Sequence, residues 1–297
     1  MNERVQRSGP TQMFSWGQPV ASGAQVSPDT LPLVVLGRNI LRTQSVNPYR
    51  IALVEVARRL LWDLNPESWR SRARMKALRN SHRGEKAVIL CNGPSLNGVD
   101  FSLLEGVYCF GLNKIDLLFS RHAFRPSCIV ATNLLVIEQQ REFFNRTDIP
   151  LFLHSLATVS IKKSPSRIFI PATVTNRKFA RDCSLSVYHG ATVTFVALQL
   201  AYHMGFTSVA LVGCDHHYET VGHPNQRVAC GASDPNHFDP TYFANQTWQL
   251  PDLLESEYDY RMALDAYGRG RRLLVNATDG GKLEVLPRLS LREFLAC

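Results

Sequence analysis

Short apolar runs recur along the chain from residue 86 onward, and segments with helical spacing lie between them. Short apolar runs between turn signals are typical of buried strands, and their alternation with helices is typical of a parallel sheet. The predicted strands cover residues 86–91, 107–112, 127–131, 150–154, 167–170, 208–213 and 271–276. We therefore predict an α/β fold with a Rossmann-like, doubly wound and mainly parallel sheet.

Apolar residues at helical spacing predict the remaining elements. Pro66 suits the first turn of a helix, and Gly205 suits the residue that ends one. The predicted helices cover residues 48–64, 66–78, 134–144, 190–203 and 252–268. From composition and periodicity we expect three parts, which are a disordered or loose tail at 1–30, a helical N-terminal extension at 31–85 and the Rossmann-like domain at 86–297.

The first predicted strand ends in Asn92-Gly93-Pro94-Ser95, a turn with little side-chain bulk. Backbone N–H groups and short polar side chains at such a turn can approach a phosphate or a ribose closely. An ordinary strand-to-helix turn would have the same composition. The segment alone does not separate these two interpretations.

Three further predicted strands also end in polar residues, at Asn113, at Thr132-Asn133 and at Asp215. The carboxyl ends of parallel strands meet at one edge of a sheet, where ligands of α/β proteins bind. These side chains are therefore expected to surround one cleft. Neither G-x-G-x-x-G nor G-x-x-x-x-G-K-[ST] occurs, which argues against dehydrogenases and P-loop ATPases.

A long polar loop at about 216–250 is expected to form an active-site lid, because loops of this length inside a domain tend to be functional. Its titratable and aromatic residues are His216, His217, Tyr218, His223, Asp234, His237, Asp239 and Tyr242. Histidine is the natural general base near neutral pH. A metal site made of His216, His217, His223 and Asp234 is an alternative. No known metal-ligand spacing occurs, and we expect no metal.

Composition limits the compartment and the partners. The seven cysteines are scattered and odd in number, which indicates a reducing compartment. No apolar run is long enough to span a membrane and no secretory signal is present, so we expect a cytoplasmic protein.

The net charge of +8 is concentrated around 58–83, where Trp62 and Trp69 interrupt a series of arginines. This segment is either a solvated helix face or a peripheral contact with the inner face of the membrane.

Several segments of the chain together resemble the bacterial sialyltransferases of glycosyltransferase family 42. They are the Cys91–Leu96 segment, the strand ends at Asn113 and Asn133, the small-residue helix at 190–205 and the Cys214-Asp215 strand end. The similarity extends to proteins that share a domain with 6-hydroxymethylpterin diphosphokinases, and it covers about residues 86–290. It implies a GT-A-like variant of the Rossmann-like fold. It also implies an inverting, metal-independent transfer of an acidic sugar, of the sialic acid or Kdo type, from a CMP-sugar to a glycan or lipid-linked acceptor in surface polysaccharide or lipopolysaccharide synthesis.

The resemblance also implies roles for individual residues. His237 would be the general base, with Asp239 in reserve because the family's second histidine is absent, and Tyr218 would donate to the leaving phosphate. The nucleotide-binding set would be Asn92, Gly93, Pro94, Ser95, Asn113, Thr132, Asn133, Ala191, Thr192, Asp215, His217 and Tyr242. We expect a nucleotide-sugar donor and a glycan or lipid-linked acceptor as partners, a homo-oligomer, and no nucleic acid.

Two alternatives remain open at this point. A diphosphokinase of the pterin type would need ATP and Mg²⁺, for which Asp215 and Asp234 are the available carboxylates. A non-catalytic nucleotide- or glycan-binding protein would bind its ligand without turnover.

Overall fold

The computed structural model describes residues 47–173, 178–219 and 222–297 of the chain. The predicted tail at 1–30 and residues 31–46 of the predicted helical extension lie outside these residues. Within them, no helix is long and apolar enough to cross a membrane.

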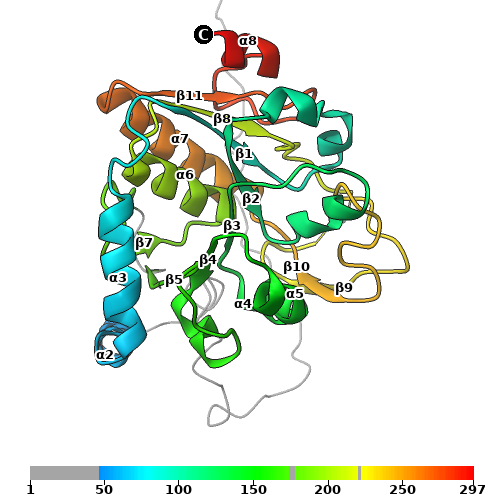
Figure 1. Cartoon of the computed structure of the whole chain (residues 1–297). Helices are drawn as coiled ribbons and strands as arrows, with labels where there is room; N and C mark the ends of the chain where they lie inside the picture. The colour runs from blue at the N-terminus through cyan, green and yellow to red at the C-terminus, as the bar shows by residue number, and fades with distance from the viewer. Residues whose placement is uncertain (1–46, 174–177, 220–221) are drawn as a thin grey trace, which may run out of the picture. The chain divides into compact units, whose positions relative to one another are not determined.

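Seven parallel strands form the central sheet, in the order β11-β8-β1-β2-β3-β4-β5 (Figure 1). Their bounds are β1 Lys86–Leu90, β2 Tyr108–Leu112, β3 Cys128–Ala131, β4 Leu151–His154, β5 Arg167–Ile170, β8 Ser208–Val212 and β11 Leu273–Asn276. Each lies within or beside a predicted strand. The prediction of a doubly wound α/β fold with a parallel sheet is therefore confirmed.

The strands are apolar throughout because both faces of the sheet are covered. Alternate residues of β1 belong to different cores, with Ile89 facing one and Leu90 facing the other. Helices α6 (Val193–Met204) and α7 (Leu253–Arg269) pack side by side over the first core (Figure 1). The short helices α4 (Leu134–Gln139), α5 (Arg141–Arg146) and α8 (Leu291–Ala296), together with 3₁₀ turns, cover the second.

Two predicted elements differ from the structure. The helix predicted at 134–144 is two short helices, α4 and α5, which meet at Gln140, a residue outside helical geometry. The loop at 216–250 contains two antiparallel strands, β9 (Arg227–Ala229) and β10 (Thr247–Gln249). Periodicity misses both features because each element is too short to show a repeat.

Two helices precede the sheet, α2 (Pro48–Asp63) and α3 (Pro66–Leu78), each with an asparagine at its N-cap and a proline in its first turn. Helix α3 is fastened to the outer strand β5. The Ser71 hydroxyl accepts a hydrogen bond from the Phe169 amide at 3.0 Å. The Arg74 guanidinium donates to the Arg167 carbonyl at 2.7 Å.

The order of the strands reverses between β1 and β8. From β1 the chain proceeds outward to β5, through the short parallel pair β6 (Ala172–Thr173) and β7 (Val187–Tyr188), and helix α6 then returns it to the other side of β1. A reversal of this kind leaves a crevice at the carboxyl ends of the two adjacent strands. The fold therefore places its natural ligand site between the residues that follow β1 and those that follow β8.

Candidate functional site

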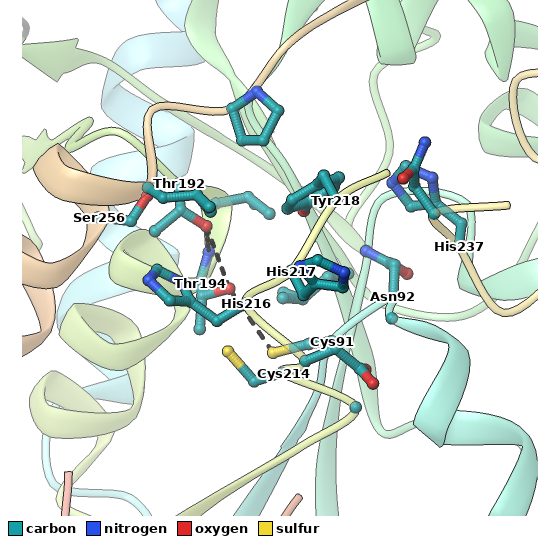
Figure 2. A pocket seen from close by; sticks show the side chains of 18 of the residues that line it. Cys91, Asn92, Thr192, Thr194, Cys214, His216, His217, Tyr218, His237 and Ser256 are labelled. Carbon is teal, nitrogen blue, oxygen red and sulfur yellow. Dashed lines mark hydrogen bonds between the residues drawn. The ribbon is translucent and has the colours of Figure 1, made fainter. Parts of the chain in front are cut away.

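A cavity of about 130 Å³ lies at this reversal point, with walls from the ends of β1, β2 and β8, the starts of α6 and α7, and the segment after β8 (Figure 2). Nine of the predicted site residues line it, namely Asn92, Gly93, Asn113, Ala191, Thr192, Asp215, His217, Tyr218 and His237. The structure thus brings together residues that are spread over 146 positions of the chain, from 92 to 237.

The two strand ends interlock through Gly93 and Asp215. The Gly93 amide donates to the Gly213 carbonyl at 2.8 Å. The Asp215 carboxylate accepts from the Ser95 hydroxyl at 2.7 Å and from the Ser95 amide at 3.3 Å. A Cβ on residue 93 would lie 1.9 Å from an Asp215 carboxylate oxygen, so only glycine fits there. Asp215 therefore holds the turn after β1 in place, and Ser95 faces Asp215 instead of the cavity.

Two amide oxygens of the cavity wall are buried without a hydrogen-bond partner among the described residues, Asn92 Oδ1 and Asn113 Oδ1. A buried acceptor left unpaired costs free energy unless a ligand or water supplies a donor. Asn113 also has a left-handed backbone, with φ of 50°. These two side chains are therefore suited to accept hydrogen bonds from a ligand.

His237 is held by a buried carboxylate. Its Nδ1 lies 2.8 Å from Asp234 Oδ2, and the side chains are 9% and 0% exposed. Burial acts to raise the pKa of Asp234, but the hydrogen bond and charge of His237 and backbone amides outweigh it, so this pKa lies below its usual range. Because the carboxylate accepts, Nδ1 carries a proton, and the lone pair of the neutral imidazole is then on Nε2. This arrangement suits a general base.

Aromatic rings fix the orientation of His237. Its imidazole stacks on the Tyr242 ring, with centroids 4.1 Å apart and planes 6° apart, and it contacts Phe243 and Trp248 edge-on. Tyr242, which was predicted to bind the nucleotide, is 1% exposed and does not line the cavity, and the structure places its ring against the imidazole of His237.

The segment that carries these rings is fastened to the end of β2 by Lys114. The ammonium group donates to the Tyr242 carbonyl at 2.6 Å and to Gln246 Oε1 at 2.8 Å, and it lies 4.5 Å from the centre of the Phe243 ring. Lys114 is 3% exposed, and burial lowers its pKa to about 8. The sequence analysis did not single out this residue, because a lone lysine after a strand carries no motif.

Helix α6 begins at the cavity wall. Thr192 caps it by accepting from the Thr194 amide at 3.2 Å, and the two threonine hydroxyls lie 3.2 Å apart (Figure 2). The Ala191 amide donates to Asp259 of α7. The first turns of α6 and α7 both line the cavity, through Thr192 to Thr194 and through Leu253 and Ser256. Helix N-termini with their outward N–H groups favour anions such as phosphate.

The floor of the cavity holds residues that the sequence analysis did not place in the site. Cys91 Sγ lies 3.6 Å from the Thr194 hydroxyl (Figure 2). Cys214 Sγ lies 3.4 Å from the Tyr260 hydroxyl. Thr194, His216, Asn236, Ser256 and Tyr260 also line the cavity. Cys91 and Cys214 are each next in the chain to a predicted site residue, Asn92 or Asp215, and this was the available signal for them, whereas His216 was already named as a residue of the predicted lid.

Several predicted site residues lie away from the cavity. Asn133 caps α4 by accepting from the Leu135 amide at 2.9 Å, and Thr132 is 2% exposed at the end of β3. Asp239 accepts from the Thr241 amide at 2.9 Å and pairs with Arg121 at 3.1 Å. Pro94 and Ser95 lie in the turn behind Gly93 and do not line the cavity. The strand ends at β1 and β8 converge, and the end of β3 does not.

The histidines and Asp234 of the long loop do not form a metal centre among the described residues. No group of three His, Cys, Asp or Glu side chains in that part of the chain is placed so that it could hold an ion. His216 instead has Nε2 3.3 Å from Glu257 Oε1, and burial lowers its pKa in spite of that carboxylate.

One family model matches residues 65–221, which is 157 of the 297 residues, and it is described as 6-hydroxymethylpterin diphosphokinase MptE-like. The chain belongs to this family. The matched MptE-like region includes the ends of β1 and β8 and the start of α6, whereas Asp234 and His237 lie beyond it. A relation to proteins of this kind is part of the sequence prediction. The resemblance to glycosyltransferase family 42 stays a prediction.

A solved structure, that of the MAf glycosyltransferase from Magnetospirillum magneticum AMB-1, is similar to 75% of this MptE-like chain at 17% identity and a TM-score of 0.46. The match spans 38% of that protein. A likeness at this level carries no information on the chemistry of the present cavity. A comparison with curated proteins returns no match.

Proposed function

We propose that this MptE-like protein is a glycosyltransferase that moves a sugar from a nucleotide-activated donor to an acceptor hydroxyl. The observation that carries the proposal is the pair of Asp234 and His237 at a cavity that also presents two helix N-termini and two unpaired amide oxygens. A base, a site for an anion and acceptors for ligand N–H or O–H groups are the three parts that such a transfer needs.

In the proposed reaction, His237 Nε2 takes the proton of the acceptor hydroxyl while its oxygen attacks the anomeric carbon. The bond from that carbon to the phosphate oxygen breaks, and the nucleotide leaves with the electron pair. Burial raises the pKa of Tyr218, so its hydroxyl stays protonated and can donate to the departing phosphate. The single displacement inverts the anomeric centre, and asparagine and threonine groups hold the nucleotide.

The donor proposed is a CMP-activated acidic sugar, of the sialic acid or Kdo type, and the acceptor a glycan or a lipid-linked sugar. The cavity of about 130 Å³ is smaller than the roughly 300–1,000 Å³ of most small-molecule sites. The proposal therefore requires the cavity to widen when the donor binds. No metal is assigned to the reaction, so activity is expected to survive EDTA.

The alternative is the pterin diphosphokinase activity that the family description names. It would need Mg²⁺, with Asp215 and Asp234 as its carboxylates. These residues do not fit that role well, because Asp215 is bound to Ser95 and Asp234 to His237. Hard cations need free carboxylate oxygens. The engagement of both carboxylates therefore favours transfer from a sugar nucleotide over the Mg²⁺-dependent diphosphokinase reaction.

A thermal-shift screen against CMP, UDP, GDP and Mg-ATP, followed by assays of nucleotide release from the matching sugar nucleotides, tests the proposal. A ligand at 100 times its dissociation constant stabilises by roughly 2.7 kcal/mol, so the preferred nucleotide will be evident. We expect CMP to stabilise and CMP to be released from CMP-sugars in EDTA. Stabilisation by Mg-ATP alone, with no release from any sugar nucleotide, would establish the diphosphokinase alternative.

A further inference from the structure

Helix α2 has an apolar face that no described residue covers. Tyr49, Leu53, Val56, Leu60 and Leu64 recur at helical spacing, and their exposed fractions are 83%, 70%, 55%, 57% and 75%. We call these five residues the α2 face. Trp62, on the other side of the helix, is 7% exposed and belongs to the core. The helix is therefore packed along one side and presents a continuous apolar stripe on the other.

A tryptophan extends this stripe. Trp69 of α3 is 62% exposed, and its Nε1 donates to the Asp63 carbonyl at 2.9 Å. That bond places the indole at the end of α2, next in the chain to Leu64. An exposed indole with an apolar ring and a polar edge is typical of residues at a membrane–water interface.

The same segment holds most of the net positive charge of the protein. Residues 47–83 contain nine Lys and Arg and three acidic residues, a net charge of +6 out of +8 for the whole chain. Asp63 pairs with Arg59 and Arg72. Glu55 and Glu67 pair with three other arginines, which are Arg58, Arg70 and Arg74. With all three carboxylates engaged, the exposed Arg50, Lys76 and Arg83 remain as excess charge.

Helix α2 lies at the carboxyl edge of the sheet, the edge that carries the cavity. The Arg59 guanidinium donates to the Leu185 carbonyl at 3.1 Å. Leu185 precedes β7, which pairs with β6 just beyond the carboxyl end of β5, and the chain continues from β7 into the cavity wall at Ala191. A surface bound to α2 would therefore lie at the same edge of the sheet as the cavity.

We propose that the α2 face and Trp69 dock on the surface of an anionic lipid bilayer. An amphipathic helix with an apolar stripe and flanking cations binds such a surface through buried apolar area and attraction to the headgroups. A second copy of the chain on the same face would bring two segments of the same net positive charge together. Anionic headgroups neutralise the same charges.

Flotation of the full chain with lipid vesicles tests the proposal without any substrate, so its outcome is independent of the proposed function. We expect binding to vesicles of phosphatidylcholine with 30% phosphatidylglycerol, and less binding to phosphatidylcholine alone or at higher salt, because salt screens the charges. Leu60→Glu should weaken the partition coefficient by roughly 10-fold or more, the effect of losing one buried leucine.

The matched control is Leu273→Glu, which makes the same substitution at the first residue of β11, on the opposite edge of the sheet, where the leucine is 38% exposed. It should bind vesicles as the parent does, and the thermal midpoints of both variants report that they fold. Absence of parent binding to the anionic vesicles, or equal binding by Leu60→Glu, overturns the proposal. So does a dimer in light scattering that Leu60→Glu dissociates while vesicle binding stays unchanged.

Discussion

Two strand ends of the same sheet edge have nearly the same composition and different surroundings. The end of β1 carries Asn92 and Gly93, and the end of β3 carries Thr132 and Asn133. Asn92 has a buried oxygen without a partner at the cavity, whereas the Asn133 oxygen caps a helix. The first asparagine is available to a ligand, and the second is used by the fold.

The difference follows from the order of the strands. Strand β1 neighbours β8. The chain after β1 winds toward β5, the chain after β8 winds toward β11, and the crevice lies between these two strand ends. Strand β3 lies between β2 and β4, and the chain after it turns at once into α4. A polar residue after a strand is therefore evidence of a site only at the point where the winding of the sheet reverses or on the strand next to it, as Asn113 after β2 shows.

The largest expected effect is on the reaction rate, and it distinguishes two residues of the loop at 216–250, His237 and Asp239. His237→Ala should lower the rate of nucleotide release by roughly 10²- to 10⁴-fold, the usual contribution of a general base. Asp239→Ala should leave the rate nearly unchanged, because Asp239 binds Arg121 and Thr241 away from the cavity. Initial rates with the donor found in the nucleotide screen measure both. A greater loss in Asp239→Ala would make Asp239 the base.

The next effect concerns the charge that holds this loop to the sheet. Burial lowers the pKa of Lys114 to about 8, from about 10.4 in an unfolded chain, so between these values the unfolded state binds more protons. The free energy of unfolding should therefore rise with pH between about 8 and 10.4, by about 3 kcal/mol at most, relative to Lys114→Met. Denaturant titrations of both proteins at several pH values measure the difference. If the free energies of unfolding of the two proteins change with pH in the same way, burial does not lower the pKa of Lys114.

A smaller effect tests how closely β1 and β8 approach. Gly93→Ala should lower the free energy of unfolding by roughly 1–3 kcal/mol, because the new methyl group collides with the Asp215 carboxylate and the Gly213 carbonyl. Gly98→Ala is the control, since a Cβ there meets nothing within 4 Å. Adding Asp215→Ala to Gly93→Ala should recover part of the loss. Equal stability of the two alanine variants would contradict the interlock.

The smallest effects compare the two asparagines directly. Asn92→Ala should weaken nucleotide binding while leaving the protein about as stable, because its oxygen has no partner in the described structure. Asn133→Ala should cost about 1 kcal/mol of stability, the usual value of an N-cap, without weakening the nucleotide. Calorimetric titration and thermal unfolding of both variants separate the two roles. The reverse result would place the ligand at the end of β3.

The sequence analysis succeeded where the signal lies within a few residues. Gly205 ends α6 with φ of 97°, as its type predicted, and the strands follow the apolar runs. The sequence does not show which residues meet through tertiary contacts. It names both Asp234 and Asp239 as loop residues, and only the structure shows that Asp234 pairs with His237. Both aspartates lie near His237 in the chain, so spacing could not separate them.

The sequence by itself determined the alternation of strands and helices and the caps of the helices, together with the polar residues at the strand ends. These properties depend on periodicity and on local hydrogen bonds, which neighbouring residues settle. Only the tertiary structure decided which strand ends meet, why residue 93 has no space for a side chain, and that α2 presents its apolar stripe outward. These depend on contacts between segments more than a hundred residues apart, and no local pattern encodes such contacts.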